Sequence, residues 1–84
     1  MMNELKQKEE GLYHLEAIGY SCPYPELLAR QALEEINEGE VLHIETDNKP
    51  SVEEVPEMAT EKGHQVIEVE QIEKGRWLIK IKKK

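Results

Sequence analysis

The chain has 84 residues, enough for one domain, and carries 18 acidic and 11 basic residues for a net charge of −7. This balance opposes binding to a nucleic-acid phosphate backbone, so no direct nucleic-acid contact is expected. No apolar run approaches the ~20 residues that span a bilayer and no signal peptide is recognisable, so membrane insertion is not expected. A single cysteine and the lack of a secretion signal indicate the reducing cytoplasm.

The first ten residues are polar, charged and without periodicity. We therefore expect residues 1–10 to form a flexible leader, followed by a single domain at residues 11–84. Residues 12–18 are rich in apolar side chains and short, which is typical of a strand inside a sheet. Gly19 marks the end of this strand.

Residues 25–37 have apolar side chains at helical spacing, which predicts an amphipathic helix. Its inward stripe is expected to hold Leu28, Ala29, Ala32, Leu33 and Ile36. Gly39 then suits a left-handed cap after the helix. Residues 41–46 predict a second strand, in which alternate side chains share one face.

A second helix is predicted at residues 51–62, because Ser51 and Glu54 form a capping-box pattern and Gly63 stops the segment. The preceding residues, 47–50, are read as a turn. Pro56 would remove a hydrogen bond from the helix interior. The helix proper is therefore expected either to begin at Pro56 or to follow a short turn.

The last two strands are predicted at residues 65–72 and 76–82, joined by a short hairpin loop that contains Gly75. The resulting order is β-α-β-α-β-β. A right-handed crossover makes the first two strands parallel and puts both helices on the same side. The predicted fold is α+β: a two-layer α/β sandwich with two helices packed on one face of a four-stranded mixed sheet.

Cys22 is the only cysteine, so neither an internal disulfide nor a multi-cysteine metal site is available to it. A lone cysteine is often just a small buried apolar side chain. Here it stands at a strand-to-helix turn, between Gly19 and two prolines, Pro23 and Pro25. Both prolines suit the first turn of a helix, and each restrains the residue before it. The chemistry left to such a thiol is to act as a nucleophile or to carry a group.

The predicted surroundings of Cys22 act in opposite directions on its thiolate. The unpaired N–H groups and positive dipole end of the following helix favour the ionised form. Glu16 and Glu26 add negative charge, and no cation directly flanks the cysteine. We therefore expect moderate activation. Because loops after parallel strands meet at one edge, Asp47 and Ser51 are expected in a neighbouring loop.

The three histidines, His14, His43 and His64, match no compact metal-ligand spacing. No metal site is expected, and nothing in the sequence implies a cofactor. A cysteine hydrolase would need a histidine base beside Cys22, and no feature places one there.

The chain resembles the TusA/SirA/YedF family of sulfur carriers, whose motif is Cys-Pro-x-Pro after an apolar strand and a glycine. The likeness runs from Leu12 onward. The matching segments are residues 16–25, residues 37–40, Asp47, Val55-Pro56, Gly63-His64 and the closing two strands. Two positions depart from the pattern: the family often has Asp where Glu16 stands, and a basic residue where Ser21 stands.

The resemblance implies that Cys22 accepts a sulfane sulfur as a persulfide and hands it to a partner protein. It also implies the sandwich fold inferred above. Gly19, Pro23, Pro25 and Glu16 would support the cysteine. Donor and acceptor proteins, such as a cysteine desulfurase or another sulfur relay protein, would be the partners of a monomeric carrier.

Two other interpretations stay open. In the first, the Cys22 thiolate processes thiosulfate directly, as a sulfurtransferase. In the second, the protein is a non-catalytic regulatory module that binds other proteins, and the Cys-Pro-x-Pro turn only caps a helix. Whether the chain is an enzyme or a passive carrier is not decided by its sequence.

Overall fold

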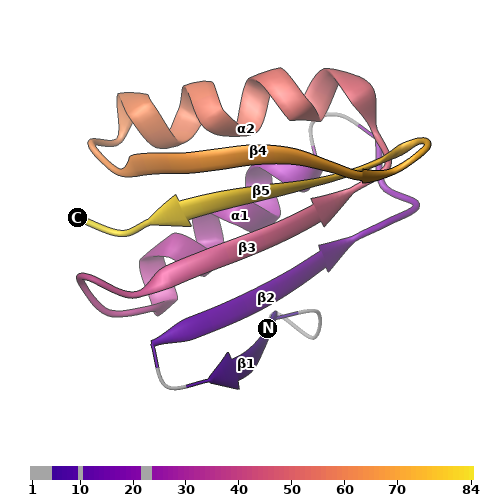
Figure 1. Ribbon diagram of the computed structural model, residues 1–84. Helices are drawn as coiled ribbons and strands as arrows, with labels where there is room; N and C mark the ends of the chain where they lie inside the picture. Colours follow the sequence, from indigo (N-terminus) through magenta and orange to yellow (C-terminus); the bar gives the residue numbers. More distant parts are fainter. Residues whose placement is uncertain (1–4, 10, 22–23) are drawn as a thin grey trace.

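The computed structural model describes the backbone of residues 5–9, and residues 11–21 and 24–84 in full (Figure 1). The described residues form two helices and five strands in the order β1-β2-α1-β3-α2-β4-β5. Their bounds are β1 Leu5–Glu9, β2 Leu12–Ala17, α1 Tyr24–Glu35, β3 Val41–Thr46, α2 Lys49–Glu61, β4 Gln65–Glu73 and β5 Arg76–Lys82.

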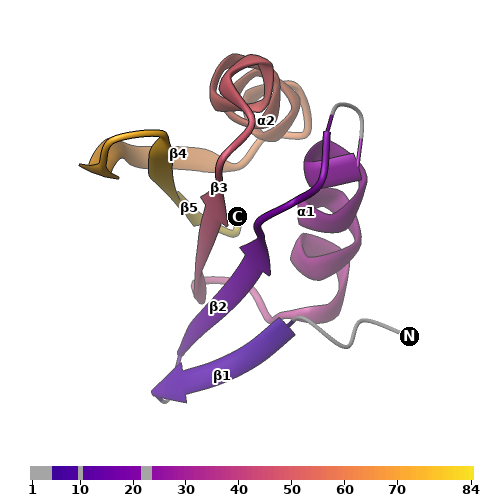
Figure 2. The same ribbon diagram turned by 90° about the vertical axis from the view of Figure 1, so that its right-hand side faces the viewer.

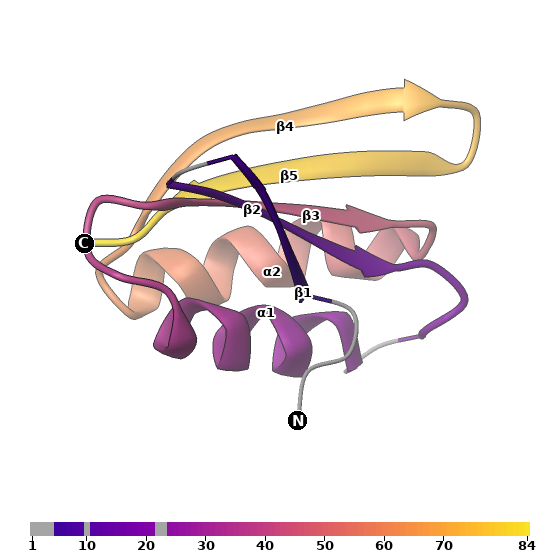
Figure 3. The ribbon, with the colours of Figure 1, turned by 90° about the horizontal axis from the view of Figure 1, so that it is seen from below.

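The strands form one mixed sheet in the order β1-β2-β3-β5-β4. β2 and β3 are parallel, and the other neighbouring pairs are antiparallel. Both helices lie on the same face of the sheet, and the opposite face is open (Figures 2 and 3). The predicted two-layer α+β sandwich with the order β-α-β-α-β-β is therefore confirmed for the elements from β2 to β5.

The sequence predicted a flexible leader at residues 1–10. The described part of that segment, Leu5–Glu9, instead forms a fifth strand. β1 pairs antiparallel with β2, with Leu5 opposite Leu15 and Lys6 opposite His14. Gly11, whose φ is +82°, lies where the chain reverses between the two strands. The pairing uses backbone groups on the free edge of β2 and needs little apolar periodicity, which explains why Leu5–Glu9 carried no recognisable strand pattern.

The core lies between the sheet and the helices and is almost wholly aliphatic. The predicted inward stripe of α1 is confirmed, although Leu28 is only partly buried. Alternate residues of β3 and β5 supply the other side of the core. The buried apolar residues are Leu15, Ala17, Ala29, Ala32, Leu33, Ile36, Leu42, Ile44, Val55, Met58, Ala59, Ile79 and Ile81.

Helix α2 begins at Lys49, before the predicted start at Ser51. Its N-cap is Asn48, whose Oδ1 accepts a hydrogen bond from the Ser51 N–H at 3.2 Å. The helix also runs without a break through Pro56, so both expectations for that proline were wrong. Buried Val55 and its neighbours pack α2 on the sheet, and this packing offsets the one missing backbone hydrogen bond.

The C-terminal residues contact the chain just after α1 and just after α2. The Lys83 Nζ donates to the carbonyl oxygen of Ile36 at 2.7 Å, just beyond the end of α1. A cation at this place satisfies an unpaired carbonyl and suits the negative end of the helix dipole. The backbone N–H of Lys84 donates to Nδ1 of His64 at 3.2 Å, so the tail is also held to the α2–β4 turn.

Candidate functional site

Three segments meet at the edge of the sheet where β2 and β3 end. Because these strands are parallel and Ala17 lies beside Thr46, the loops that follow them emerge together. β5 runs antiparallel to β3 and pairs Trp77 with Thr46, so the β4–β5 hairpin reaches the same edge (Figure 1). We call this the carboxyl edge: residues 18–21 and Tyr24, residues 47–48 and the hairpin at residues 73–76.

Cys22 and Pro23 come between residue 21 and Tyr24 in the chain and lie outside the described residues. The residues on either side are described. The Tyr24 N–H donates to the carbonyl oxygen of Ser21 at 3.0 Å, and α1 begins at Tyr24. Pro25, in the first helical turn, is fully buried and anchors the start of the helix in the core.

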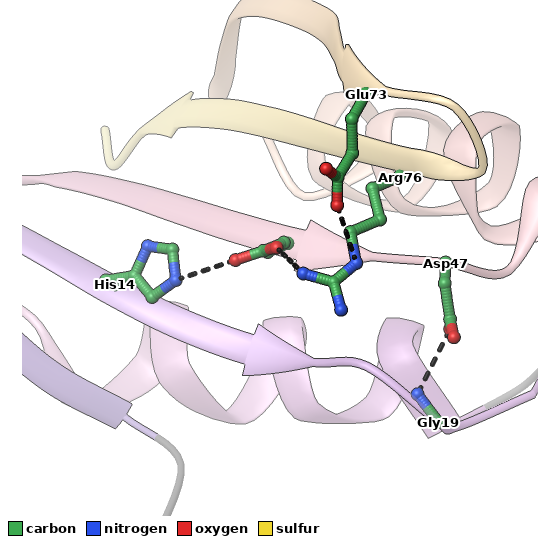
Figure 4. Close-up of polar contacts among 6 residues, drawn as sticks. His14, Gly19, Asp47, Glu73 and Arg76 are labelled. Carbon is green, nitrogen blue, oxygen red and sulfur yellow. Dashed lines mark hydrogen bonds and ion pairs between the residues drawn. The ribbon is translucent and has the colours of Figure 1, made fainter.

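A hydrogen bond ties the base of this loop to the end of β3. Oδ1 of Asp47 accepts from the Gly19 N–H at 3.1 Å, although the two residues are 28 positions apart in the chain (Figure 4). Gly19 has φ +88°, in the left-handed region that other residues rarely adopt. The structure thus brings two of the expected site residues together, and the pair fixes where the loop leaves the sheet.

The remaining expected residues have different surroundings. Ser51 is buried, and its hydroxyl donates to Asn48 Oδ1 at 2.9 Å. Its polar groups therefore belong to the N-cap of α2. Glu16 is exposed near the end of β2. The Asn48 N–H donates to Oγ1 of buried Thr46 at 3.1 Å, and this hydrogen bond links the loop after β3 to the end of the strand.

Two tyrosines, not singled out by the sequence analysis, flank the Cys22 position. The ring centroids of Tyr20 and Tyr24 lie 6.1 Å apart, with the ring planes tilted by 44°. Tyr20 is 36% exposed and Tyr24 is 58% exposed. Their position four residues apart around the Cys-Pro dipeptide was visible in the sequence, but only the fold shows that the rings meet.

A network of ion pairs on the open face of the sheet holds the hairpin in place. Glu45, whose side chain is only 15% exposed, lies 3.5 Å from Nε2 of His14 and 3.3 Å from the Arg76 guanidinium. Arg76 also pairs with Glu73 at 3.2 Å (Figure 4). Glu45 therefore joins β2 to the β4–β5 hairpin. These contacts depend on the register of three strands, which the sequence alone does not give.

Two ionisable groups elsewhere have shifted pKa values. A hydrogen bond from Lys80 to Glu68, with Glu70 nearby, raises the pKa of the Lys80 ammonium. Burial lowers the pKa of His64, and the positive charges of Lys83 and Lys62 lower it further. Neither residue belongs to the carboxyl edge.

Within the described residues, no three histidine, aspartate or glutamate side chains converge as metal ligands. Neither helix in that part of the chain is long and apolar enough to cross a bilayer.

In comparisons with known proteins, the chain matches proteins that are described as sulfurtransferases or sulfur carriers. The profile of the family described as sulfurtransferase TusA matches residues 13–83. A "Putative sulfur carrier protein" of Archaeoglobus fulgidus is 37% identical over 70 residues, which are 83% of this chain and 80% of that protein. A protein of Methanocaldococcus jannaschii with the same description is 42% identical over 69 residues, 82% of this chain and 91% of its own length.

Among solved structures, the crystal structure of a SirA-like protein from Desulfitobacterium hafniense superposes with a TM-score of 0.76 and 30% identity. The match covers 84% of this chain and 95% of that protein. The match to the profile includes the stretch from Gly19 to Pro25, and therefore the position of the only cysteine.

Proposed function

Because the chain belongs to the TusA sulfurtransferase family, we propose that it is a sulfur carrier in which Cys22 accepts a sulfane sulfur as a persulfide and passes it to a partner protein. The observation that carries this proposal is the family match over residues 13–83, which includes the only thiol of the chain. We place this activity in the cytoplasm, where thiols stay reduced.

The loading step is a thiol exchange without net oxidation. The Cys22 thiolate attacks the terminal sulfur of a donor persulfide; a new S–S bond forms, the donor S–S bond breaks, and the donor leaves as a thiolate. The proton lost by the Cys22 thiol ends on that leaving thiolate. In the delivery step a thiolate of the acceptor attacks the terminal sulfur in the same way, and Cys22 leaves as the thiolate.

The described residues around the cysteine support such a role. α1 begins two positions after Cys22 in the sequence, and the amino end of a helix favours an anion. The Gly19–Asp47 hydrogen bond and buried Pro25 fix the chain on both sides of the reacting residue. A rigid base reduces the entropy lost when the thiol must meet a donor sulfur in one orientation.

The chain offers no positive side chain close in sequence to stabilise the thiolate, because residues 11–29 contain no lysine or arginine. The family often has a basic residue where Ser21 stands. We infer that activation comes mainly from the helix end and is moderate.

Mass spectrometry of the intact protein tests the proposal. The purified chain is incubated with inorganic polysulfide, with a cysteine desulfurase plus cysteine, or with thiosulfate, and compared with Cys22→Ala. We expect one added sulfur mass that a reductant removes and that the Cys22→Ala variant lacks. A wild-type chain that takes up no sulfur from any of the three donors would contradict the persulfide proposal.

The same experiment separates the alternatives. Loading from thiosulfate alone, with release of one sulfite for each sulfur bound, would identify direct thiosulfate processing, in which the thiolate attacks the sulfane sulfur and sulfite leaves. If Cys22→Ala keeps full activity in a reconstituted sulfur-transfer system, the chain is instead a non-catalytic binding module.

A further inference from the structure

We propose that Glu45 is a positioning residue for sulfur transfer from a donor protein to this chain: through Arg76 it holds the β4–β5 hairpin where the donor contacts the carboxyl edge. This inference rests on the proposed function and adds to it how the fold presents the contact surface. Glu45 alternates along β3 with buried Ile44 and Thr46, so it faces away from the helices. Its role in the transfer is indirect and runs through the hairpin.

The first observation is the number of strands that the contacts of Glu45 connect. Its Oε2 lies 3.3 Å from Nη1 of Arg76, at the start of β5, and its Oε1 lies 3.5 Å from Nε2 of His14 on β2. The Arg76 Nε in turn lies 3.2 Å from Oε1 of Glu73, at the end of β4 (Figure 4). Contacts centred on one side chain of β3 therefore link four strands beside the turn of the hairpin.

The second observation is that this network is shielded from water and fixed in geometry. The Glu45 side chain is only 15% exposed. The carboxylates of Glu68 and Glu70, which share Lys80 farther along the same two strands, are 53% and 46% exposed. Water screens an ion pair less where the charges are less exposed. Two different nitrogens of the Arg76 guanidinium are engaged by two carboxylates, which fixes the orientation of this planar group.

The third observation is how little else holds the end of the hairpin. β3 ends at Thr46, which pairs with Trp77, so residues 73–76 project beyond β3 (Figure 1). Residues 71–75 are all exposed, and both helices lie on the other face of the sheet (Figure 2). The pairing of β4 with β5 is also irregular between Gln71 and Glu73. The contact between Glu45 and Arg76 is thus a side-chain link from this projecting end to the middle of the sheet.

The area of a protein contact brings the hairpin into it. A standard interface covers about 800 Å² of each partner, which corresponds to a disc about 32 Å across. The Cα atoms of this molecule span 30 × 24 × 23 Å along its principal axes. A donor that covers such an area around residues 18–21 and Tyr24 therefore extends across the carboxyl edge and meets the hairpin. Docking against a hairpin in one fixed position loses less entropy than docking against one that moves.

The competing explanation is that these ion pairs only stabilise the fold. The chain contains a matched case that separates the two explanations. Lys80 also lies on β5 and pairs with two carboxylates, Glu68 at 3.2 Å and Glu70 at 3.5 Å. Lys80 pairs in the sheet with His43, near the middle of β3, so this second network lies away from the carboxyl edge. Its loss should affect stability without affecting the contact with a donor.

Steady-state sulfur transfer tests the proposal. A purified cysteine desulfurase with radiolabelled cysteine loads the wild-type chain, Glu45→Gln, Arg76→Gln, their double variant, and the control Lys80→Gln. Urea denaturation measures the stability of each protein. Arg76, whose side chain is 43% exposed, tests the same link if Glu45→Gln does not fold. NMR relaxation of the Lys74 and Gly75 amides reports motion of the hairpin, and loading from inorganic polysulfide reports the reactivity of the thiol itself.

We expect Glu45→Gln and Arg76→Gln each to raise the KM for the carrier about fivefold, with kcat and polysulfide loading unchanged. The double variant should have a KM close to that of the single variants, because each change removes the same link. Lys80→Gln should stay within about twofold of the wild-type KM. The amides of Lys74 and Gly75 should become more mobile in the first two variants and not in Lys80→Gln.

Three results would overturn the role of Glu45. They are an unchanged KM in both Glu45→Gln and Arg76→Gln, an equal rise of KM in Lys80→Gln, and a raised KM without increased motion of the hairpin. If polysulfide loads the wild-type chain but neither the desulfurase nor a persulfide-bearing rhodanese does, positioning for a donor protein is also wrong while persulfide formation stands. If polysulfide itself leaves no sulfur on Cys22, the proposed function fails instead.

Discussion

The hydrogen bond between Asp47 and Gly19 gives the sharpest prediction about how the fold holds the cysteine loop. Asp47→Ala removes the side-chain acceptor of the Gly19 N–H, whose nitrogen lies 3.1 Å from Oδ1 in an exposed position. Hydrogen bonds to charged acceptors contribute about 1.5–3 kcal/mol when buried, and exposure to water lowers this toward about 1 kcal/mol. We therefore expect the free energy of unfolding to fall by about 1 kcal/mol.

Two measurements check this value. Urea denaturation gives the change in unfolding free energy, and amide hydrogen exchange of Gly19 reports the local bond. Asp47→Asn is the matched control, since its amide oxygen can still accept from Gly19. We expect it to retain most of the stability and of the exchange protection that Asp47→Ala loses. If Asp47→Ala exchanges its Gly19 amide at the wild-type rate, the bond does not hold the loop in solution and this reasoning is wrong.

Three further predictions concern single residues. Gly19→Ala should cost about 1 kcal/mol, measured by urea denaturation, because its φ is +88° while the space for a Cβ is open; a larger loss would indicate a steric clash. Pro56→Ala should raise the unfolding free energy by about 1–2 kcal/mol by restoring a helical hydrogen bond, whereas Pro50→Ala, in the first turn of α2, should not. For His64, whose pKa is lowered in the folded state, the unfolded chain binds the proton first as pH falls through 6.5. Wild-type stability should therefore drop below that pH more than that of His64→Gln, and parallel stability curves for the two proteins would refute this role.

Both helices and the strands β2, β3 and β5 were predictable because each buries one face of apolar side chains in the core, whereas β4, also predicted, has only Val66 partly buried. Residues 12–18 read as a strand, and the stripe from Ala29 to Ile36 read as a helix, since apolar periodicity reflects the face that packs inward. β1 was missed because an edge strand can be held mainly by backbone hydrogen bonds to its neighbour. Its partner, β2, was identified correctly, but nothing in Leu5–Glu9 indicates that it pairs there.

The candidate site was predictable only in part. The rule that loops after parallel strands share an edge placed Asp47 near the Gly19 loop, but it did not identify the hydrogen bond. Ser51 was expected at the same edge, yet its hydroxyl bonds to Asn48. Asn48 and Ser51 are both residue types that cap helices well. The path of the chain after β3 determines that Asn48 is the N-cap of α2. The meeting of Tyr20 and Tyr24 depends on the conformation of the loop, which no periodic pattern encodes.

The size of the domain constrains how one cysteine can serve two partners. The accessible surface is 5137 Å², and a standard interface covers about 800 Å² of each partner. If the proposed function is correct, a donor and an acceptor must each reach the same sulfur, and two interfaces of this size around one atom overlap. The two proteins could then not be bound together, so a loaded carrier would have to leave the donor before it meets the acceptor. The proposal therefore requires that each complex be short-lived.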